Sequence, residues 1–481
     1  MKLSIRDELS FRANSQGSKI AIKTARHTIN YKQLYQFTSQ AITFFSNLGI
    51  RQGQRVLIAG HDDALNLMII LSLMRMGVTS CLNHGIHNLS HAKDFDWLLS
   101  THPTEHMPSN RFCLIDKGAI DQIKNGAPHN EADIQGTLSL IILSSGTTGK
   151  HKKIGLSQEL LLDRIFKTHR IWGLNQSLNL MRLSTTIGIG HSLLKILLGE
   201  TLYLVDSDVE AIDFIKKFNL KILIASPIQL AQLINQLGDS DLKNTLDRVL
   251  YSGSMAHEKL LKNIQSKLSD NIHVLYGATE TGGISGASIS LKNPLGIGGF
   301  LLPGVKVDIV RDSSEQEWGK VRIKSEHGVT QYLDDDQLSK EFFKDGWFYP
   351  GDEGRLINEN FLVLNQRESD ILNIGGVKLN PLIIENQIHQ AFEFKDLAVF
   401  ELILPSGQGV VALAYVASPN SNALSVENLR QALQKSLSPI QTPQYIFLVN
   451  QIPRNLGGKV LRNNLTETIS KNFLKEKIKG A

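Results

Sequence analysis

Cysteine is scarce in this sequence, with only Cys81 and Cys113 among 481 residues. Two thiols are too few for a disulfide framework. Long apolar runs are also missing, because no window approaches eighteen uninterrupted apolar residues, and we therefore expect no membrane-spanning helix. Residues 1–17 lack the apolar core of a signal peptide. These absences predict a soluble, cytoplasmic protein.

Clustered positive charge is absent as well. The sequence contains no run of five or more Lys or Arg residues, and its formal net charge of +5 is modest for this length. A nucleic-acid partner is therefore not indicated. An anionic substrate or cofactor is compatible with the same charge.

The length of the chain exceeds what one hydrophobic core usually supports, so we expect at least two domains. Hydrophobic residues make up 42% and charged residues 20%, as in ordinary globular proteins. Strand and helix patterns alternate through most of the chain, which predicts layered α/β structure, and 304–325 has a β-rich pattern. Beyond 367 the pattern changes to a smaller αβ unit. We place the boundary at 366–371, giving domains 1–367 and 368–481.

The expected elements follow from hydrophobic periodicity and from turn and cap residues. Residues 101–135 are polar and poorly periodic, which predicts surface loops with short elements. The expected strands are 19–24, 28–31, 55–59, 221–225, 248–253, 273–275, 397–404 and 409–417, and the expected helices are 31–48, 65–77, 158–171, 228–237, 257–268, 381–393 and 426–437.

A glycine- and hydroxyl-rich loop follows the apolar run 138–143. Two glycines allow its backbone N–H groups to point at an anion, and hydroxyls and lysines add donors and positive charge. This composition predicts a polyphosphate cradle; the alternative is a flexible turn with solvated lysines. It is not a Walker A loop, because that spacing needs glycine at 144 and Ser or Thr at 151. The residues involved are Ser144, Ser145, Gly146, Thr147, Thr148, Gly149, Lys150, Lys152 and Lys153.

Two acidic residues stand at positions suited to a nucleotide. Glu280 ends the string 276–280, directly after an apolar strand, where a carboxylate can hold Mg²⁺ and the Thr279 hydroxyl can meet a phosphoryl oxygen. Asp352 ends the glycine-containing segment 346–352 and can accept two hydrogen bonds from a ribose diol. The alternatives are a solvated glutamate in a surface loop and an ordinary Asp-containing turn.

Lys459 lies on a glycine loop within 453–462. A lysine there can swing into a site and bridge a carboxylate and an α-phosphate, lowering their repulsion. The alternative is an exposed surface lysine.

Together these segments resemble the adenylate-forming superfamily of acyl-CoA synthetases, aryl-CoA ligases, luciferases and peptide-synthetase adenylation domains. SSGTTGKHKK at 144–153 is similar to the family pattern SSGTTGxPKG, and 276–280 is similar to YGxTE. The segments 346–352, 365–370 and 453–462 resemble the later motifs in the same order, so the resemblance covers essentially the whole chain. The departures from the family pattern are His151, Lys153, Pro350, Gln366 and Ser369.

The resemblance implies an α/β fold, with a large multi-subdomain N-terminal domain of layered sheets plus a β-rich part. A small mobile α+β C-terminal domain would carry the catalytic lysine. It implies that a small carboxylic acid attacks ATP·Mg²⁺ to give an acyl-adenylate and pyrophosphate. A thiol then forms a thioester, either that of CoA or the phosphopantetheine of an acyl carrier protein.

The resemblance also assigns residue roles. Ser369 would be the hinge, and 373–378 would be the loop that serves the thiol step. The implied catalytic residues are Lys459, Thr148 and Glu280, with Glu280 as the metal ligand; the implied nucleotide contacts are Ser144, Ser145, Gly146, Thr147, Thr148, Gly149, Lys150, Lys152, Tyr276, Gly277, Thr279, Asp352 and Arg367; the thiol-side loop residues are Gly375, Gly376 and Lys378.

The acid is expected to be aromatic and to lack an α-amino group. Segment 187–193 resembles a string of benzoate-CoA ligases, and 178–199 contains no aspartate of the kind that pairs an α-ammonium group in amino-acid-activating domains. His191 is a pocket residue in this interpretation and a core or capping histidine in the alternative. The expected pocket residues are Thr186, Gly188, His191, Gly253, Ser254, Ala278 and Gly282.

Three other classes of protein share these motifs. One is a stand-alone adenylation enzyme that loads a carrier protein, and a second is a luciferase-like oxidase. The third is a non-catalytic binding protein that kept the fold, suggested by the five departures. Because the residues expected at the catalytic, metal and ribose positions are all present, the sequence favours an enzyme.

Overall fold

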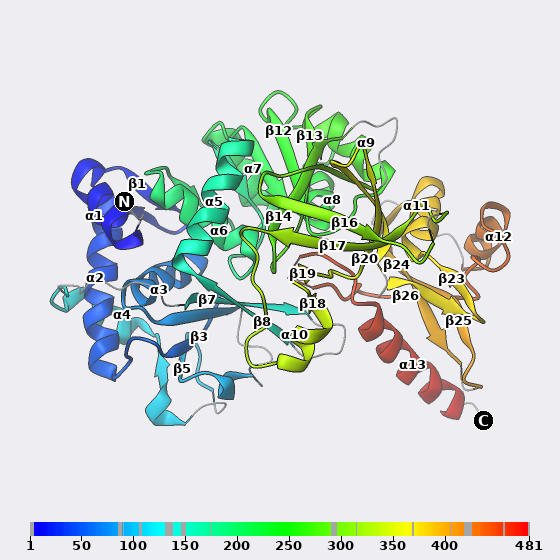
Figure 1. Cartoon of the computed structure of the whole chain (residues 1–481). Helices are drawn as coiled ribbons and strands as arrows, with labels where there is room; N and C mark the ends of the chain where they lie inside the picture. The colour runs from blue at the N-terminus through cyan, green and yellow to red at the C-terminus, as the bar shows by residue number, and fades with distance from the viewer. Residues whose placement is uncertain are drawn as a thin grey trace.

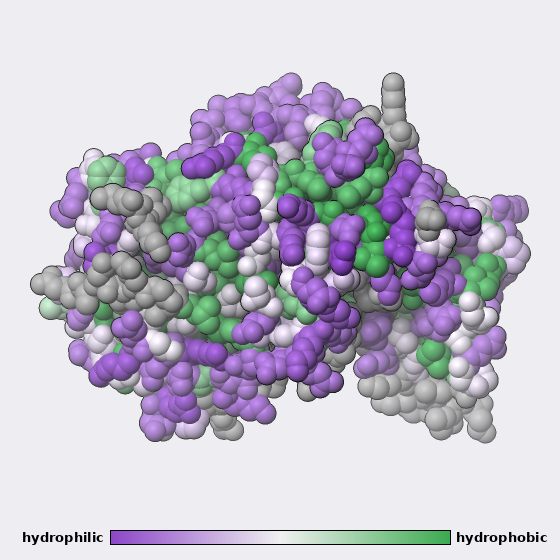
Figure 2. Space-filling view, viewed as in Figure 1, coloured by the Kyte–Doolittle hydropathy of each residue, from purple (hydrophilic) through white to green (hydrophobic). Residues whose placement is uncertain are grey.

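The computed structural model describes residues 4–84, 89, 91–104, 108–129, 138–145, 151–173, 175–289, 296–313, 315–367, 370–404, 406–417, 426–455 and 457–479. Figure 1 shows two β-sheet layers in the main body and a smaller unit beside them that ends in helix α13. In Figure 2, hydrophilic residues cover most of the visible face, and hydrophobic residues form separate green areas near its middle.

The first sheet has the strand order β6-β5-β3-β4-β7-β8. Its strands are parallel except for the antiparallel pair β7 and β8. Helix α3 is buried on nearly all sides, as its continuous apolar sequence requires. The strands are β3 (Arg55–Gly60), β4 (Thr79–His84), β5 (Trp97–Ser100), β6 (Phe112–Leu114), β7 (Leu138–Ser145) and β8 (His151–Ser157), and the accompanying helices are α2 (Tyr31–Leu48), α3 (Asp63–Arg75), η1 (Ala92–Asp94), η2 (Ser109–Arg111) and α4 (Lys117–Asn125).

Local signals fix the ends of helix α2. The Asn30 side chain accepts a hydrogen bond from the Gln33 backbone, and Gln33 accepts one in return from the Asn30 backbone. This reciprocal capping box begins the helix, and Gly49 ends it with a left-handed φ of 99°.

The second sheet changes from parallel to antiparallel along its width, in the order β18-β19-β17-β20-β21-β15-β14-β13-β12-β11-β9, with β16 beside β17. Strands β9 to β13 are parallel, whereas β14 runs antiparallel to β13. Its members are β9 (Ser177–Asn179), β11 (Ile222–Ala225), β12 (Arg248–Ser252), β13 (Ile272–Ala278), β14 (Gly282–Ser288), β15 (Ile297–Leu301), β16 (Val305–Val310), β17 (Gly319–Ser325), β18 (Phe343–Lys344), β19 (Trp347–Phe348), β20 (Asp352–Ile357) and β21 (Phe361–Arg367), with helices α7 (Asp208–Lys217), α8 (Pro227–Leu237), α9 (Glu258–Lys267) and α10 (Asp336–Phe342).

Helices α5 (Gln158–Trp172) and α6 (Thr186–Leu197) join the two sheets through one core. Leu161 and Leu193 belong to the same buried cluster as Leu140 of the first sheet and Ile224 of the second. A short sheet at the N-terminal side combines β10 (Leu202–Tyr203), β1 (Ile20–Lys23) and β2 (Thr28–Asn30), next to α1 (Ile5–Gln16).

The unit after residue 370 has cores of its own, built on the two faces of a three-stranded sheet. Leu397 and Val399 face one cluster, and Ala398 and Phe400 alternate with them toward the other. Helices α11 and α12 contribute to the first cluster and α13 to the second. The elements are β22 (Leu372–Ile374), β23 (Val377–Leu379), α11 (Pro381–Ala391), β24 (Phe394–Ile403), β25 (Gly409–Ala417), α12 (Val426–Ser436), β26 (Tyr445–Leu448) and α13 (Arg462–Lys479).

The mixed α/β fold expected from the sequence is confirmed, and the expected elements lie within a few residues of those found. Strand β13 is longer than the sequence predicts. Strand β13 continues through Ala278 because β14 pairs with Tyr276 and Gly277, so the first part of the 276–280 motif is strand and not loop. None of the helices in the described residues is long and apolar enough to cross a membrane.

Candidate active site

A carboxylate and a guanidinium form the first part of the site at the start of β20 and the end of β21. Asp352 and Arg367 are register partners, and Arg367 Nε lies 3.2 Å from Asp352 Oδ1. Tyr276 donates a hydrogen bond of 2.5 Å from its hydroxyl to Asp352 Oδ2. Burial, together with the Asp352 charge, raises the pKa of Tyr276, so it remains a donor. The carboxylate is therefore fixed in orientation.

The second part of the site is a buried carboxylate. Glu280 is 7% exposed, and its Oε1 accepts a 2.8 Å hydrogen bond from the Tyr332 hydroxyl. Lys152 Nζ lies 3.4 Å from the same hydroxyl and 3.2 Å from the centre of the Phe342 ring. Burial lowers the pKa of Lys152 to about 8. A lysine and a glutamate thus lie on either side of one phenol.

Arg164 of helix α5 holds the backbone of this carboxylate. Its guanidinium donates to three carbonyl oxygens, those of Thr279 at 2.8 Å, Glu280 at 3.0 Å and His327 at 2.7 Å. The planar fork of arginine suits several acceptors at once. Sequence reasoning missed this residue, although an arginine among the buried positions Leu161, Leu162 and Ile165 of an amphipathic helix is a usable signal.

A cavity of about 470 Å³ lies between α5, α6 and the ends of β12 and β13. Its wall is largely apolar and includes Trp172, Met181, Leu194 and Ile224. Five of the residues expected to line an acyl pocket border this cavity, namely Thr186, His191, Gly253, Ala278 and Gly282. The Thr186 hydroxyl also donates to Thr279 Oγ1 at 3.2 Å.

The other two expected pocket residues lie elsewhere. Gly188 packs behind the wall, because a Cβ added there would be 1.9 Å from Arg182 O. Ser254 lines the neighbouring cavity instead.

His191 is buried, and its Nε2 lies 2.8 Å from Ser177 Oγ. Burial lowers the pKa of His191 to about 3, with a further contribution from Lys195. The imidazole is therefore neutral at physiological pH and offers a polar but uncharged edge to the cavity.

A second cavity, of about 610 Å³, separates the main body from the C-terminal unit. Asp352 and Arg367 line it from one side and Lys459 from the other. Lys459 Nζ forms a 2.8 Å ion pair with Asp370 Oδ1. The two cavities share one wall, made of Tyr251, Gly253, Leu275, Gly277, Ala278 and Arg454.

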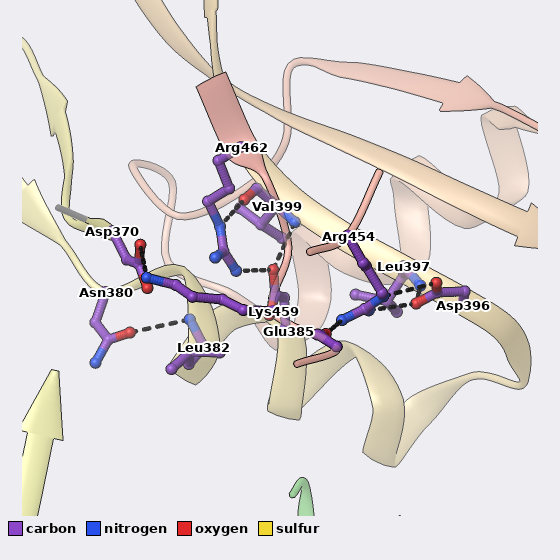
Figure 3. Close-up of polar contacts among 11 residues, drawn as sticks. Asp370, Asn380, Leu382, Glu385, Asp396, Leu397, Val399, Arg454, Lys459 and Arg462 are labelled. Atoms are coloured by element: carbon purple, nitrogen blue, oxygen red, sulfur yellow. Dashed lines mark hydrogen bonds and ion pairs between the residues drawn. The ribbon is translucent and has the colours of Figure 1, made fainter. Parts of the chain in front are cut away.

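Two arginines fix the loop that carries Lys459 (Figure 3). Arg454 pairs with both oxygens of Asp396 at 3.1 and 2.7 Å and donates to Gly458 O at 2.7 Å. Arg462 donates to Glu385 Oε1 at 2.5 Å and to Val399 O at 2.9 Å. The loop is therefore held at both ends by its own unit.

Several expected residues cannot be placed in this way. Gly146, Thr147, Thr148, Gly149, Lys150 and Ser369 lie outside the described residues, as do the side chains of Ser145 and His151. Ser144 lines the apolar cavity. Gly375 and Gly376 form the left-handed turn between β22 and β23, with φ of 58° and 87°, and Lys378 follows as an exposed residue of β23.

Three departures from the motif pattern have structural partners. Lys153 forms ion pairs with Asp94 at 2.9 Å and Asp334 at 3.3 Å, so its positive charge is balanced by carboxylates of the protein. The carbonyl of Pro350 accepts a hydrogen bond from Arg367 at 2.9 Å. Gln366 donates to Glu353 at 2.9 Å.

A family model described as "AMP-binding enzyme" matches residues 89–333. The chain belongs to this family, as its motifs predicted. Among curated proteins, it is 24% identical to a 2-succinylbenzoate–CoA ligase of Geobacillus sp. (strain WCH70), over 98% of this chain and 99% of that one. It is 23% identical to the enzyme of the same name from Listeria monocytogenes serotype 4b (strain F2365), over 87% and 90%.

Solved structures of similar fold come from acid–CoA ligases. One is the o-succinylbenzoate CoA synthetase of Bacillus subtilis with its acyl-adenylate intermediate, with a TM-score of 0.79, 21% identity and coverage of 95% of this chain and 97% of that one. Another is an anthranilate CoA ligase with anthranoyl-AMP, with a TM-score of 0.82, 19% identity and 97% coverage of each chain. The likeness extends over nearly the whole fold, including the C-terminal unit.

Proposed function

We propose that this protein is an AMP-forming acid–CoA ligase that activates an aromatic carboxylic acid. The observation that carries the proposal is the placement of Lys459, which faces the same cavity as the Asp352–Arg367 pair. We assign the ribose to that pair and the acid to the apolar cavity, and the wall shared by the two cavities lies between them. The relatives are named as CoA ligases, which favours CoA over a carrier protein as the acceptor.

Binding of magnesium fits Glu280. A carboxylate oxygen is a ligand that Mg²⁺ prefers, and Mg²⁺ in nucleotide enzymes is commonly held by one or two carboxylates plus phosphate oxygens. The ion would neutralise charge on the phosphates.

In the first step, an oxygen of the acid's carboxylate attacks the α-phosphorus of ATP, and pyrophosphate leaves. Lys459 places positive charge between the two anions, which favours the transition state over the separated ground states. We assign Thr148 and Thr279 to the α-phosphate, and Arg164 holds the backbone at Thr279 and Glu280. Positioning and charge stabilisation account for most of the catalysis in such a transfer.

In the second step, the sulfur of CoA attacks the carbonyl carbon of the acyl-adenylate, and AMP leaves. We propose that the small domain, 368–481, rotates about Ser369 to bring the loop with Gly375, Gly376 and Lys378 to the site. The separate cores on either side of 367–370 support this boundary.

The acid is proposed to be aromatic and to lack an α-amino group. The largely apolar wall with Trp172 and Met181 suits a ring, and 2-succinylbenzoate is the first compound to test because relatives are named for it. Both guanidiniums on that wall, Arg164 and Arg454, already bind protein oxygens. Benzoate and anthranilate are therefore the comparison acids, because each has one carboxylate where 2-succinylbenzoate has two, and so each needs fewer positive charges in the cavity.

The test is pyrophosphate release from ATP and Mg²⁺ with a panel of aryl, fatty and amino acids, followed by thioester formation with CoA. We expect an aryl acid to give the highest rate and Lys459→Ala to abolish acid-dependent release while ATP still binds. Preformed acyl-adenylate should largely restore thioester formation in that variant. Release that is fastest with an amino acid would refute the assigned acid class, and no release with any acid would refute the ligase function.

A further inference from the structure

The ammonium group of Lys459 forms an ion pair with a residue of its own unit. Its partner Asp370 lies just before β22, whereas Lys459 lies on the loop before α13 (Figure 3). The two atoms are 2.8 Å apart, and the side chains are only 22% and 15% exposed. Partial burial makes such a pair stronger than an ion pair on an open surface.

Side chains of the same unit hold both ends of the lysine loop. Arg454 pairs with Asp396 at one end, and Arg462 donates to Glu385 at the other. A lysine side chain has large rotamer entropy, which an ion pair at its tip reduces. Asp370 is the carboxylate at that tip.

The charges that face Lys459 come from both sides of the cavity. Burial lowers the pKa of Lys459 and the Arg367 guanidinium lowers it further, whereas the carboxylates of Asp370 and Asp352 raise it. Asp352 is itself paired with Arg367. Asp370 is therefore the carboxylate that contacts Lys459 directly and favours its protonated form.

We propose that Asp370 is a positioning residue for adenylation, holding the protonated Lys459 extended into the cavity where the acid and the α-phosphate meet. This inference rests on the proposed ligase function. Because both residues follow the proposed pivot at Ser369, the pair would move with the small domain as one body. Holding the cation in place before substrate binds reduces the entropic cost of reaching the reactive arrangement.

The test compares Asp370→Asn, which keeps the shape and removes the charge, with Asp370→Glu, which restores the charge. We expect Asp370→Asn to lower the rate of pyrophosphate release roughly 10- to 100-fold. The alkaline limb of its pH profile should move to lower pH, since Lys459 loses its proton more easily. Asp370→Glu should restore much of the rate, and thioester formation from preformed adenylate should be unchanged.

Asp396→Asn is the matched control, because Asp396 pairs with Arg454 on the same loop and not with Lys459. It should leave the alkaline limb in place. An Asp370→Asn enzyme with the wild-type limb and rate would overturn the proposal. So would equal shifts in the two variants, which would indicate a general effect on the loop.

A second readout does not depend on finding the acid. The rate at which an amine-reactive acetylating reagent modifies Lys459, followed by peptide mass spectrometry across pH, reports the protonation of that amine. Wild type should need a higher pH for half-maximal labelling than Asp370→Asn or Asp370→Ser. Identical labelling curves would overturn the positioning role, whereas a wild-type enzyme that releases no pyrophosphate with any acid would overturn the ligase function alone.

Discussion

The Tyr332 hydroxyl donates a 2.8 Å hydrogen bond to Glu280 Oε1, across a separation of 52 residues in the sequence. Burial and the Glu280 carboxylate raise the pKa of Tyr332, so the phenol keeps its proton and remains a donor. The bond fixes one oxygen of the carboxylate. The cation and phosphate that we assign to Glu280 would meet the other oxygen.

Tyr332→Phe should weaken the apparent affinity for Mg²⁺ about tenfold, because residues that orient a metal ligand commonly have effects of that size. The rate at saturating Mg²⁺ should change much less. The measurement is a Mg²⁺ titration of pyrophosphate release, with Mg²⁺-dependent ATP binding in the absence of acid as a second readout. Tyr349→Phe is the control, since its hydroxyl meets Arg322 instead. An unchanged Mg²⁺ requirement in Tyr332→Phe would contradict the assigned role.

Arg164→Lys should lower both the stability and the adenylation rate. An ammonium group cannot reach three carbonyls that lie around a planar fork, so buried acceptors lose their donors at a cost of about 1–3 kcal/mol. Chemical denaturation and pyrophosphate release measure the two effects. Arg170→Lys on the exposed face of the same helix is the control and should be neutral. If Arg164→Lys and Arg170→Lys had the same stability and adenylation rate, the three carbonyl contacts of Arg164 would contribute to neither.

Gly253→Ala should prevent the main body and the C-terminal unit from approaching fully. Gly253 has φ of 96°, and a Cβ added there would lie 2.4 Å from Gly457 O. Pyrophosphate release should fall at least tenfold, whereas left-handed backbone strain of about 1–2 kcal/mol by itself lowers the stability of the fold. Gly53→Ala has the strain without the contact, because nothing lies within 4 Å of its Cβ position at φ of 82°. A Gly253→Ala enzyme with the wild-type rate would show that pyrophosphate release does not need the close contact between Gly253 and Gly457.

Stability should fall as pH drops below about 6.5, the pKa of an unfolded histidine. Burial lowers the pKa of His191 to about 3, that of His257 to about 4 and that of His389 to about 2. The unfolded chain therefore binds more protons than the folded one in this range, and each such histidine costs about 1.4 kcal/mol per pH unit. His191→Gln should flatten the decline in denaturation midpoint between pH 6.5 and 4. An equally steep decline would show that other groups control it.

His257 and His389 also predict that acid separates the main body from the C-terminal unit. Their rings stack across the boundary between the main body and the C-terminal unit, with centroids 3.8 Å apart and planes 10° apart. Protonating both would place two positive charges face to face. Mild acid should therefore separate the two parts before either unfolds, which small-angle scattering can detect as an increase in radius of gyration.

The sequence was sufficient to predict the family, the α/β class and most element positions, because hydrophobic periodicity and cap residues are local signals. Asn30 and Gly49 at the ends of α2 are examples. It also indicated Asp352 and Arg367, which the structure brings to one cavity as register partners. The roles assigned to these residues are still predictions.

The sequence did not indicate the residues that act through tertiary contacts. Arg164 lies 116 positions and Tyr332 52 positions from Glu280, and Asp370 lies 89 positions from Lys459. The buried position of Arg164 on its helix is a local signal, but it does not name Glu280 as the partner. Gly188 is a different case. The sequence predicts that it lines the pocket, but it is not among the residues that border the apolar cavity, and a Cβ added there would lie 1.9 Å from Arg182 O.

The wall shared by the two cavities has a consequence for engineering the range of acids. Gly253, Gly277 and Ala278 border both spaces, so a larger residue at any of them would alter nucleotide and acid binding together. Met181, Leu194 and Ile224 border the apolar cavity alone. A mutant library confined to those three positions should reshape the cavity that we assign to the acid and leave the cavity that we assign to the nucleotide unchanged.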